Sequence, residues 1–207
     1  MKSNYKSPFF IIEDFISPLF CEDIINRLNN VYPDADKDNK FLKTIRYNNL
    51  SEFRILPYLE RIVPQLEEYY NFVSKGILRL SFEWLVEDYV VESPRCLNYK
   101  MVNNKWARIN DIGITGIVFL NDFNDKSDFD SDFEVYGGKL EFINHNLNIT
   151  PKRGTVVFFP EGPNFLNTNS SINAGELNQI RIHIASEENY NYDMNKFPGN
   201  YKTWFNK

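Results

Sequence analysis

Two histidines are the residues of this chain best suited to bind a metal ion or to move a proton near neutral pH. His145 is followed by Asn and Leu, so it forms no His-x-Asp pair. His183 alternates with isoleucines and shares the polar face of an expected strand with Gln179 and Arg181. Either imidazole could bind iron if a carboxylate converged with it. We interpret each as a solvated or hydrogen-bonded side chain, with convergence on one iron as the less favoured alternative.

The acidic residues and the cysteines give weaker indications of a metal-binding or catalytic site. Asp128–Glu134 spaces its carboxylates like calcium ligands but lacks the central Gly and full length of an EF-hand loop, so we interpret it as a solvated acidic loop. Glu83 and Glu87 fall on one face of an expected strand, which alone does not identify glycosidase chemistry. Cys21 and Cys96 are far apart and form no C-x-x-C motif, so neither a disulfide framework nor a zinc site is supported.

The elements that must position these residues change character along the chain. The first part predicts a strand over Phe9–Phe15, a helix from Ser17-Pro18 to Asn30, a loop over Val31–Asn49 and a helical stretch over Glu52–Val73. Pro57 and Pro64 predict a kink or a break in the last of these.

After Lys75-Gly76 the pattern changes to short alternating segments separated by Gly, Pro, Asn and Asp. Expected strands cover residues 77–91, 96–102, 113–120, 138–142, 155–159 and 177–185. Helices followed by a run of short strands indicate an α+β or β-barrel fold, and the 16% aromatic share suits strands. We predict a single domain over residues 1–207, with an N-terminal support (1–76), a β core (77–185) and a docked aromatic tail (186–207).

Four motifs follow one another in the second half of the chain. They are the strand Thr115–Asp122 with its Leu-Asn pair, the Gly-Gly-x-Leu-x-Phe segment in Tyr136–Phe142, the Pro-x-x-Gly segment in Ile149–Pro160, and Phe165–Ile172 before the strand that runs to Ala185. In this order they resemble the prolyl 4-hydroxylase-like Fe(II)/2-oxoglutarate dioxygenases. The resemblance covers roughly Phe9 to Ala185. It implies an α+β fold with a double-stranded β-helix core, jelly-roll or cupin-like, and N-terminal supporting helices.

That resemblance also implies where a metal site should lie. In that family, two His and one carboxylate bind iron(II). The first motif, His-x-Asp, falls within Asn98–Ile112, which contains no His; Asp111 is a remaining carboxylate, and Trp106 or Ile109 matches the region of the lost His. The second His matches Asn167, whose amide oxygen is a poorer iron ligand than imidazole.

The family's cation for the distal carboxylate of 2-oxoglutarate is also missing from its expected place. That place falls on Leu177 or Asn178, and Arg181 is the nearest cation on the strand, on the face opposite to its isoleucine neighbours. We therefore assign no catalytic residue. The degenerate-site positions are Tyr99, Trp106, Arg108, Asp111, Asn167 and Arg181, and a metal, if bound, would use Asp111, Asn167 and His183.

Three functions remain open. The first is a dioxygenase-like barrel that has lost its iron-binding triad, binds no cofactor and acts as a structural or interaction module. The alternative is an active hydroxylase of a protein or nucleotide that uses iron(II) and 2-oxoglutarate with Asp111, Asn167, His183 and Arg181 as atypical site residues. The third is a barrel mouth, lined by Tyr99, Arg108 and Asn167, that binds a small ligand without chemistry.

The stretch from Tyr136 to Phe205 also resembles dioxygenase-like proteins of large tailed bacteriophages, which implies a virion protein of a tail or neck, or an assembly protein. We expect its partners to be other proteins of that assembly, in an oligomer. The net charge of −5 and the lack of a basic stripe disfavour nucleic acid. The polar N-terminus and the short apolar runs disfavour a signal peptide and a membrane span, so we expect a location in the virion or the host cytoplasm.

Overall fold

The computed structural model describes residues 7–31, 42–47, 54–86, 95–96, 98–103 and 105–187. Its elements are β1 (Phe10–Ile12), α1 (Pro18–Val31), β2 (Leu42–Tyr47), α2 (Leu56–Tyr70), β3 (Ser74–Val86), β4 (Tyr99–Val102), β5 (Lys105–Arg108), β6 (Ile112–Phe119), β7 (Asp122–Asn124), β8 (Glu134–Gly137), β9 (Leu140–Phe142), β10 (Leu147–Ile149), β11 (Val156–Pro160), β12 (Asn167–Asn169) and β13 (Ile172–Ser186). Glu87 and nearly all of the expected docked tail lie outside the described residues.

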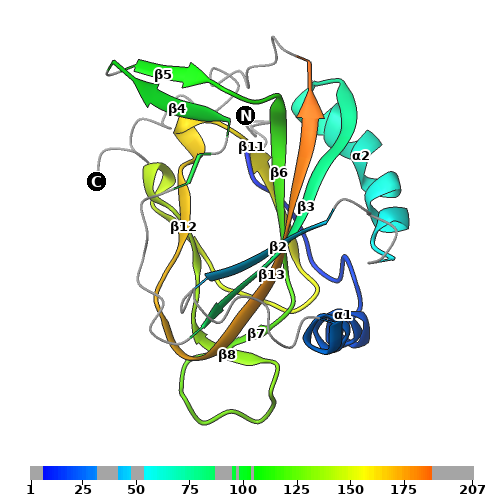
Figure 1. Ribbon diagram of the computed structural model, residues 1–207, viewed down its shortest axis with the longest axis vertical. Helices are drawn as coiled ribbons and strands as arrows, with labels where there is room; N and C mark the ends of the chain where they lie inside the picture. The colour runs from blue at the N-terminus through cyan, green and yellow to red at the C-terminus, as the bar shows by residue number, and fades with distance from the viewer. Residues whose placement is uncertain are drawn as a thin grey trace, which may run out of the picture.

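The strands form two sheets and a separate hairpin. The large sheet has the order β1-β11-β6-β13-β3-β2, with β8 paired to β13 and β7 to β8; the small sheet has the order β10-β9-β12, and β4 pairs with β5. The small sheet lies across from the large one, and α1 and α2 cover the large sheet's other face (Figure 1). This arrangement confirms the predicted α+β fold with a double-stranded β-helix core.

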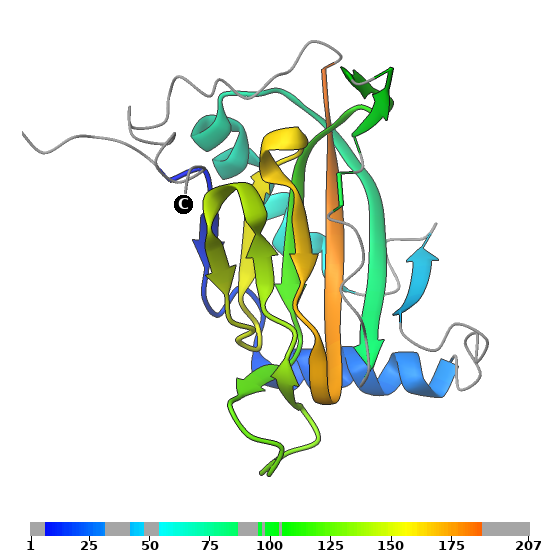
Figure 2. The ribbon, with the colours of Figure 1, turned by 90° about the vertical axis from the view of Figure 1, so that its left-hand side faces the viewer.

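Strand alternation divides the buried side chains into two cores. On β13, Ile180, Ile182 and Ile184 pack in the core between the large sheet and the helices. Leu177, on the opposite face, packs in the core between the two sheets. Gln179, Arg181 and His183 share the side of Leu177 by the period of two, so these polar residues point into the barrel. Figure 2 shows α1 crossing below the strands of the large sheet.

The N-terminal elements confirm some expectations and correct others. Ser17 caps α1, because its Oγ accepts a hydrogen bond from the backbone N–H of Phe20 at 3.2 Å. Of the kink or break predicted at Pro64, the break does not occur, since α2 continues through this residue. The loop predicted over Val31–Asn49 is also wrong in part: Leu42–Tyr47 forms β2, which pairs antiparallel with β3. No described helix is long and apolar enough to cross a membrane.

Candidate functional site

Glu83 on β3 is the buried acid of the barrel interior among the residues that the structure describes. Gln179 lies directly opposite it on β13 and donates to Glu83 Oε2 at 2.9 Å. Arg181, two residues further on the same face, donates its Nε–H to Glu83 Oε1 and Oε2 at 3.2 and 3.3 Å. The strand alternation that turns the isoleucines of β13 toward the helices therefore turns these polar side chains toward the carboxylate.

A second segment brings Arg95 and Asn167 to the same place. Arg95 forms an isolated bridge with Asn167, the first residue of β12, through N–H to carbonyl hydrogen bonds of 2.7 and 3.3 Å. The guanidinium of Arg95 donates to Glu83 Oε1 at 3.1 Å, and that of Arg181 donates through Nη1 to Asn167 Oδ1 at 3.3 Å. We call Glu83, Arg95, Asn167, Gln179 and Arg181 the polar cluster.

Burial strengthens the electrostatic interactions among the side chains of the polar cluster. Glu83 is 4% exposed and Arg181 is 2% exposed. Burial by itself would raise the pKa of Glu83, but the charges of Arg181 and Arg95 and the hydrogen bond from Gln179 outweigh it and hold that pKa below its usual value. The carboxylate is therefore ionised at neutral pH and forms a buried salt bridge.

His183 forms a separate chain of hydrogen bonds next to the cluster. Its Nδ1 lies 3.2 Å from Thr115 Oγ1 on β6, and Thr115 donates its hydroxyl proton to Glu161 Oε2 at 2.6 Å. Because that proton is used, a neutral His183 must carry its own proton on Nδ1 to complete the chain. Burial, reinforced by the charge of Arg181, lowers the pKa of His183 to about 3. This imidazole is therefore neutral near pH 7.

His145 takes no part in this chain of hydrogen bonds and is buried rather than solvated. Its ring stacks on Phe165, with centroids 4.9 Å apart, and its Nε2 lies 2.9 Å from the carbonyl oxygen of Asn164. Burial lowers the pKa of His145 to about 4. Both histidines thus take the hydrogen-bonded role that the sequence favoured, and neither lies among metal ligands in the described part of the chain.

The expected site positions fall into two groups. Asn167 and Arg181 meet in the polar cluster. Tyr99, Trp106 and Arg108 belong to the β4-β5 hairpin; Trp106 is 42% exposed, and Arg108 lies 3.7 Å from the carboxylate of Asp111 in an ion pair. The expected metal ligands have separate partners, since Asp111 is beside Arg108, Asn167 accepts from Arg181, and His183 contacts Thr115.

Sequence reasoning did not include Glu83, Arg95 or Gln179 in the site. The sequence did indicate a special role for Glu83 and Arg181, because each is a charged residue within an apolar, alternating strand. Arg95 gave no such signal, because its place opposite Asn167 depends on the pairing of two distant segments. Leu177, one of the two places expected for the cation of 2-oxoglutarate binding, is fully buried in the apolar core between the sheets.

The described residues of the cluster do not fit an iron(II) ion. Both oxygens of Glu83 already accept hydrogen bonds, and Asn167 Oδ1 accepts one from Arg181. Two guanidiniums next to the acceptors would repel a dication, and guanidinium has no lone pair to offer as a ligand. No group of three or more His, Cys, Asp or Glu side chains suited to a metal ion occurs among the residues that the structure describes.

Comparison with known proteins gives matches in structure but not in sequence. No family model matches the chain, and no curated protein matches it. A viral collagen prolyl hydroxylase from Paramecium Bursaria Chlorella virus-1, solved with 2-oxoglutarate, matches with a TM-score of 0.65 and 15% identity over 88% of this chain and 97% of the viral one. A prolyl hydroxylase from Trichoplax adhaerens, solved with a hypoxia inducible factor peptide, matches with a TM-score of 0.63 and 14% identity over 87% and 84%.

The chain has the fold of the prolyl 4-hydroxylase-like 2-oxoglutarate oxygenases. HygX from Streptomyces hygroscopicus, solved with nickel and 2-oxoglutarate, also matches, with a TM-score of 0.55 and 12% identity over 88% of this chain and 84% of HygX. These matches establish the fold and leave the expected likeness to bacteriophage proteins as a prediction.

The matches correct the cofactor expectation. We expected no cofactor, with iron(II) and 2-oxoglutarate only as the alternative. That expectation is wrong for this fold, because the viral hydroxylase structure contains 2-oxoglutarate and the HygX structure contains both nickel and 2-oxoglutarate. Any test of this chain must therefore include a metal and 2-oxoglutarate together.

Proposed function

We propose that this chain is a dioxygenase-fold barrel in which the polar cluster stands in place of the iron-binding triad, and that it acts as a structural or interaction module. The observation that carries the proposal is the buried Glu83–Arg181 pair, whose guanidinium also binds Asn167, the residue that matches the family's second His. The residue that faces Asn167 across the small sheet's edge is Arg95, again a cation and not an imidazole.

The cluster has the properties of a structural cross-link. The carboxylate of Glu83 on β3 binds β13 and the segment around Arg95, and Arg181 of β13 extends the cluster to Asn167 on β12. A planar guanidinium supplies fixed positive charge and directed N–H donors, which suit a buried carboxylate. A buried ion pair of this kind favours one arrangement of strands over others, because any other pairing would leave a charge unpaired in the interior.

The more specific proposal is a virion or assembly protein of a large tailed bacteriophage, with partners that are other proteins of the same particle. Its support is the resemblance of Tyr136–Phe205, of which residues 188–205 lie outside the described part of the chain. Loss of the triad fits such a role, because a scaffold needs the packing of the barrel and not its chemistry.

The test is anaerobic titration of the full chain with iron(II) and 2-oxoglutarate, added singly and together. If the polar cluster stands in place of the triad, the metal content after gel filtration and the charge-transfer absorbance both stay below those of a viral collagen prolyl hydroxylase treated in parallel. Release of succinate from 2-oxoglutarate is measured in the same samples. A tight site with one metal per chain, or succinate release above the protein-free rate, overturns the proposal and establishes the hydroxylase alternative.

A further inference from the structure

The β4-β5 hairpin forms a small sheet of its own, at the end of the molecule where β13 ends (Figures 1 and 2). Tyr99 pairs with Arg108, and Trp106 lies two residues before Arg108 on β5, so these three side chains share one face of the hairpin. Trp106 is 42% exposed, which leaves a large aromatic surface uncovered among the residues that the structure describes.

The chain leaves β13 at the base of this face. Ser186 is the last residue of β13, and Arg108 Nη2 donates a hydrogen bond to the carbonyl oxygen of the next residue, Glu187, at 3.4 Å. Two residues of a strand span about 7 Å, which is the separation of Arg108 and Trp106 along β5. Three residues of extended chain span about 10 Å, so Tyr190, the first aromatic residue after Glu187, can reach Trp106.

The hairpin and the segment that follows β13 carry opposite charges. Residues 99–108 contain three basic residues and no acidic one, whereas residues 187–193, Glu-Glu-Asn-Tyr-Asn-Tyr-Asp, contain three acidic residues and no basic one. In an extended segment, alternation places Glu188, Tyr190 and Tyr192 on one face. If Glu188 lies next to Arg108, the tyrosines of that face fall beside Trp106.

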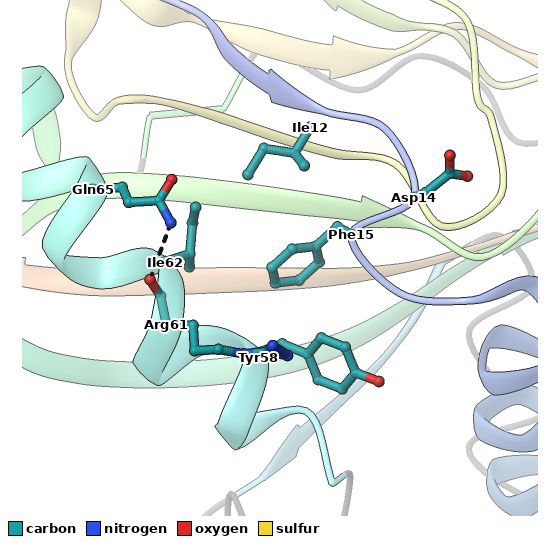
Figure 3. Close-up of a pocket in the computed structure, with 7 residues that line it drawn as sticks. All are labelled: Ile12, Asp14, Phe15, Tyr58, Arg61, Ile62 and Gln65. Atoms are coloured by element: carbon teal, nitrogen blue, oxygen red, sulfur yellow. Dashed lines mark hydrogen bonds between the residues drawn. The ribbon is translucent and has the colours of Figure 1, made fainter.

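The pocket on the helix side of the large sheet is a second surface with an apolar lining (Figure 3). It has a volume of about 410 Å³ and lies between the turn after β1 and α2, with Ile12, Phe15 and Ile62 in its lining. α2 carries three glutamates and one arginine, so its charge would repel the acidic residues 187–193. The hairpin, and not this pocket, is therefore the surface that complements the segment.

We propose that residues 188–192 cross the Trp106 face of the hairpin, with Glu188 paired to Arg108 and with Tyr190 and Tyr192 packed on the indole ring. The chain's own segment is the occupant because it is tethered at Glu187, which gives it an effective concentration on the order of millimolar at the hairpin. The inference goes beyond the proposed function, and its test measures the covering of an indole ring and not metal binding, so the two proposals can fail separately.

The first experiment is fluorine NMR of the full chain with 5-fluorotryptophan at its three tryptophans, Trp84, Trp106 and Trp204. Trp106→Phe assigns the signal of that ring, and the change in fluorine shift between H₂O and D₂O reports how far each ring is exposed to solvent. We expect a small solvent shift for Trp106 in the unchanged chain. The double variant Tyr190→Ser/Tyr192→Ser should raise it to that of free 5-fluorotryptophan.

Asn189→Ser/Asn191→Ser is the matched control for the tyrosine variant. These residues alternate with the tyrosines, so in the proposed arrangement they face away from the hairpin and their replacement should leave the Trp106 signal unchanged. Trp84 is 5% exposed and should keep its signal in every variant, which shows that the barrel remains folded.

The second experiment changes the charge of the segment at one residue at a time. Glu188→Lys places a cation next to Arg108 and should raise the solvent shift of Trp106. Glu187→Lys changes the net charge by the same amount at the neighbouring residue, whose side chain faces away, and should have a smaller effect. High salt should act in the same direction as Glu188→Lys, because it screens the attraction between the segment and the hairpin.

Four results overturn the proposal. Trp106 is as exposed in the unchanged chain as in Tyr190→Ser/Tyr192→Ser, the asparagine variant exposes it equally, the two lysine variants have equal effects, or the covering of Trp106 increases over a roughly thirtyfold rise in chain concentration. The last result assigns the hairpin to the segment of a second copy, since a tethered segment covers the ring independently of concentration.

Discussion

Glu83 is the residue on which the polar cluster depends, because it is the acceptor shared by Arg181, Arg95 and Gln179. A carboxylate that is 4% exposed would be strongly unfavourable alone, and its guanidinium partners would be equally unfavourable without it. Removing one partner from a buried ion pair costs more than the pair contributes, since the remaining charge stays in the interior.

Glu83→Gln should therefore destabilise the fold markedly. We expect the free energy of unfolding to fall by about 3 to 5 kcal/mol, because Arg181 loses its buried counter-charge. Urea denaturation followed by circular dichroism measures the change. Glu176→Gln is the matched control: Glu176 is exposed on β13, the strand of Arg181, so its change should stay within about 0.5 kcal/mol. Equal effects of the two substitutions would show that the carboxylate at position 83 has no special role.

The two buried histidines should make the folded state less stable at acid pH. Their pKa values in the folded chain, about 3 for His183 and about 4 for His145, lie below the ordinary value of 6.5. As the pH falls below 6.5, the unfolded state takes up protons that the folded state does not, so stability falls toward pH 4. Glu83 adds to this loss at lower pH, because its pKa is also lowered in the folded state and protonation removes its ion pairs.

The histidines can be observed directly, because the chain has only two. Proton–carbon NMR spectra of the imidazole rings should show both neutral from pH 7 to about pH 5. His145→Phe keeps the ring packing against Phe165 and assigns the remaining signal to His183. Titration of either ring near pH 6.5 would show that it is solvated and would contradict its buried position.

At the scale of elements, tight turns at glycine residues determine where the strands that line the barrel end and begin. Gly137 ends β8 with a φ of 103°, and a Cβ added there would lie 2.1 Å from the carbonyl oxygen of Ser171. The strand that follows this turn, β9, carries Leu140 and Phe142 into the core between the sheets. Glycine is thus required at this turn for two physical reasons, the backbone conformation and the close approach of another backbone segment.

Gly76 provides a comparison that separates those two reasons. It has a similar φ of 99°, but nothing lies within 4 Å of its added Cβ. Gly76→Ala should therefore cost only the backbone strain, about 1 to 2 kcal/mol. Gly137→Ala should cost about 1 to 3 kcal/mol more, because the steric clash with Ser171 adds to the strain. Thermal and urea unfolding of the two variants measure the difference, and equal costs would show that the Ser171 contact relaxes freely.

The elements also show how far the sequence could predict this molecule. Alternation along β13 predicted that Arg181 faces away from its isoleucine neighbours, and glycine turns with strand order predicted the barrel. β2 was not predicted, because it is a short segment within the mostly polar stretch Val31–Asn49 and its strand conformation depends on pairing with β3. The cluster was predicted only at Asn167 and Arg181, since the contacts of Glu83 and Arg95 join strands far apart in the chain.

At the scale of the whole molecule, the large sheet belongs to both cores. Alternate residues of β3, β6, β11 and β13 point to the helices and to the small sheet, so neither core can form without that sheet. The predicted N-terminal support and the predicted β core are therefore expected to unfold together. Independent units would each need their own buried core, and the described residues share one sheet between them.

This coupling predicts one cooperative transition that responds to damage in either core. Leu59 on α2 and Leu140 on β9 are both fully buried, one in each core. Leu59→Ala and Leu140→Ala should each lower the free energy of unfolding by about 2 to 5 kcal/mol, with tryptophan fluorescence and circular dichroism giving the same midpoint. Leu78→Ala, at an exposed leucine of β3, should change it by at most about 0.5 kcal/mol. An independently folding N-terminal part would instead give Leu59→Ala a separate early transition, because the barrel would then keep its stability when α2 loses contact with the sheet.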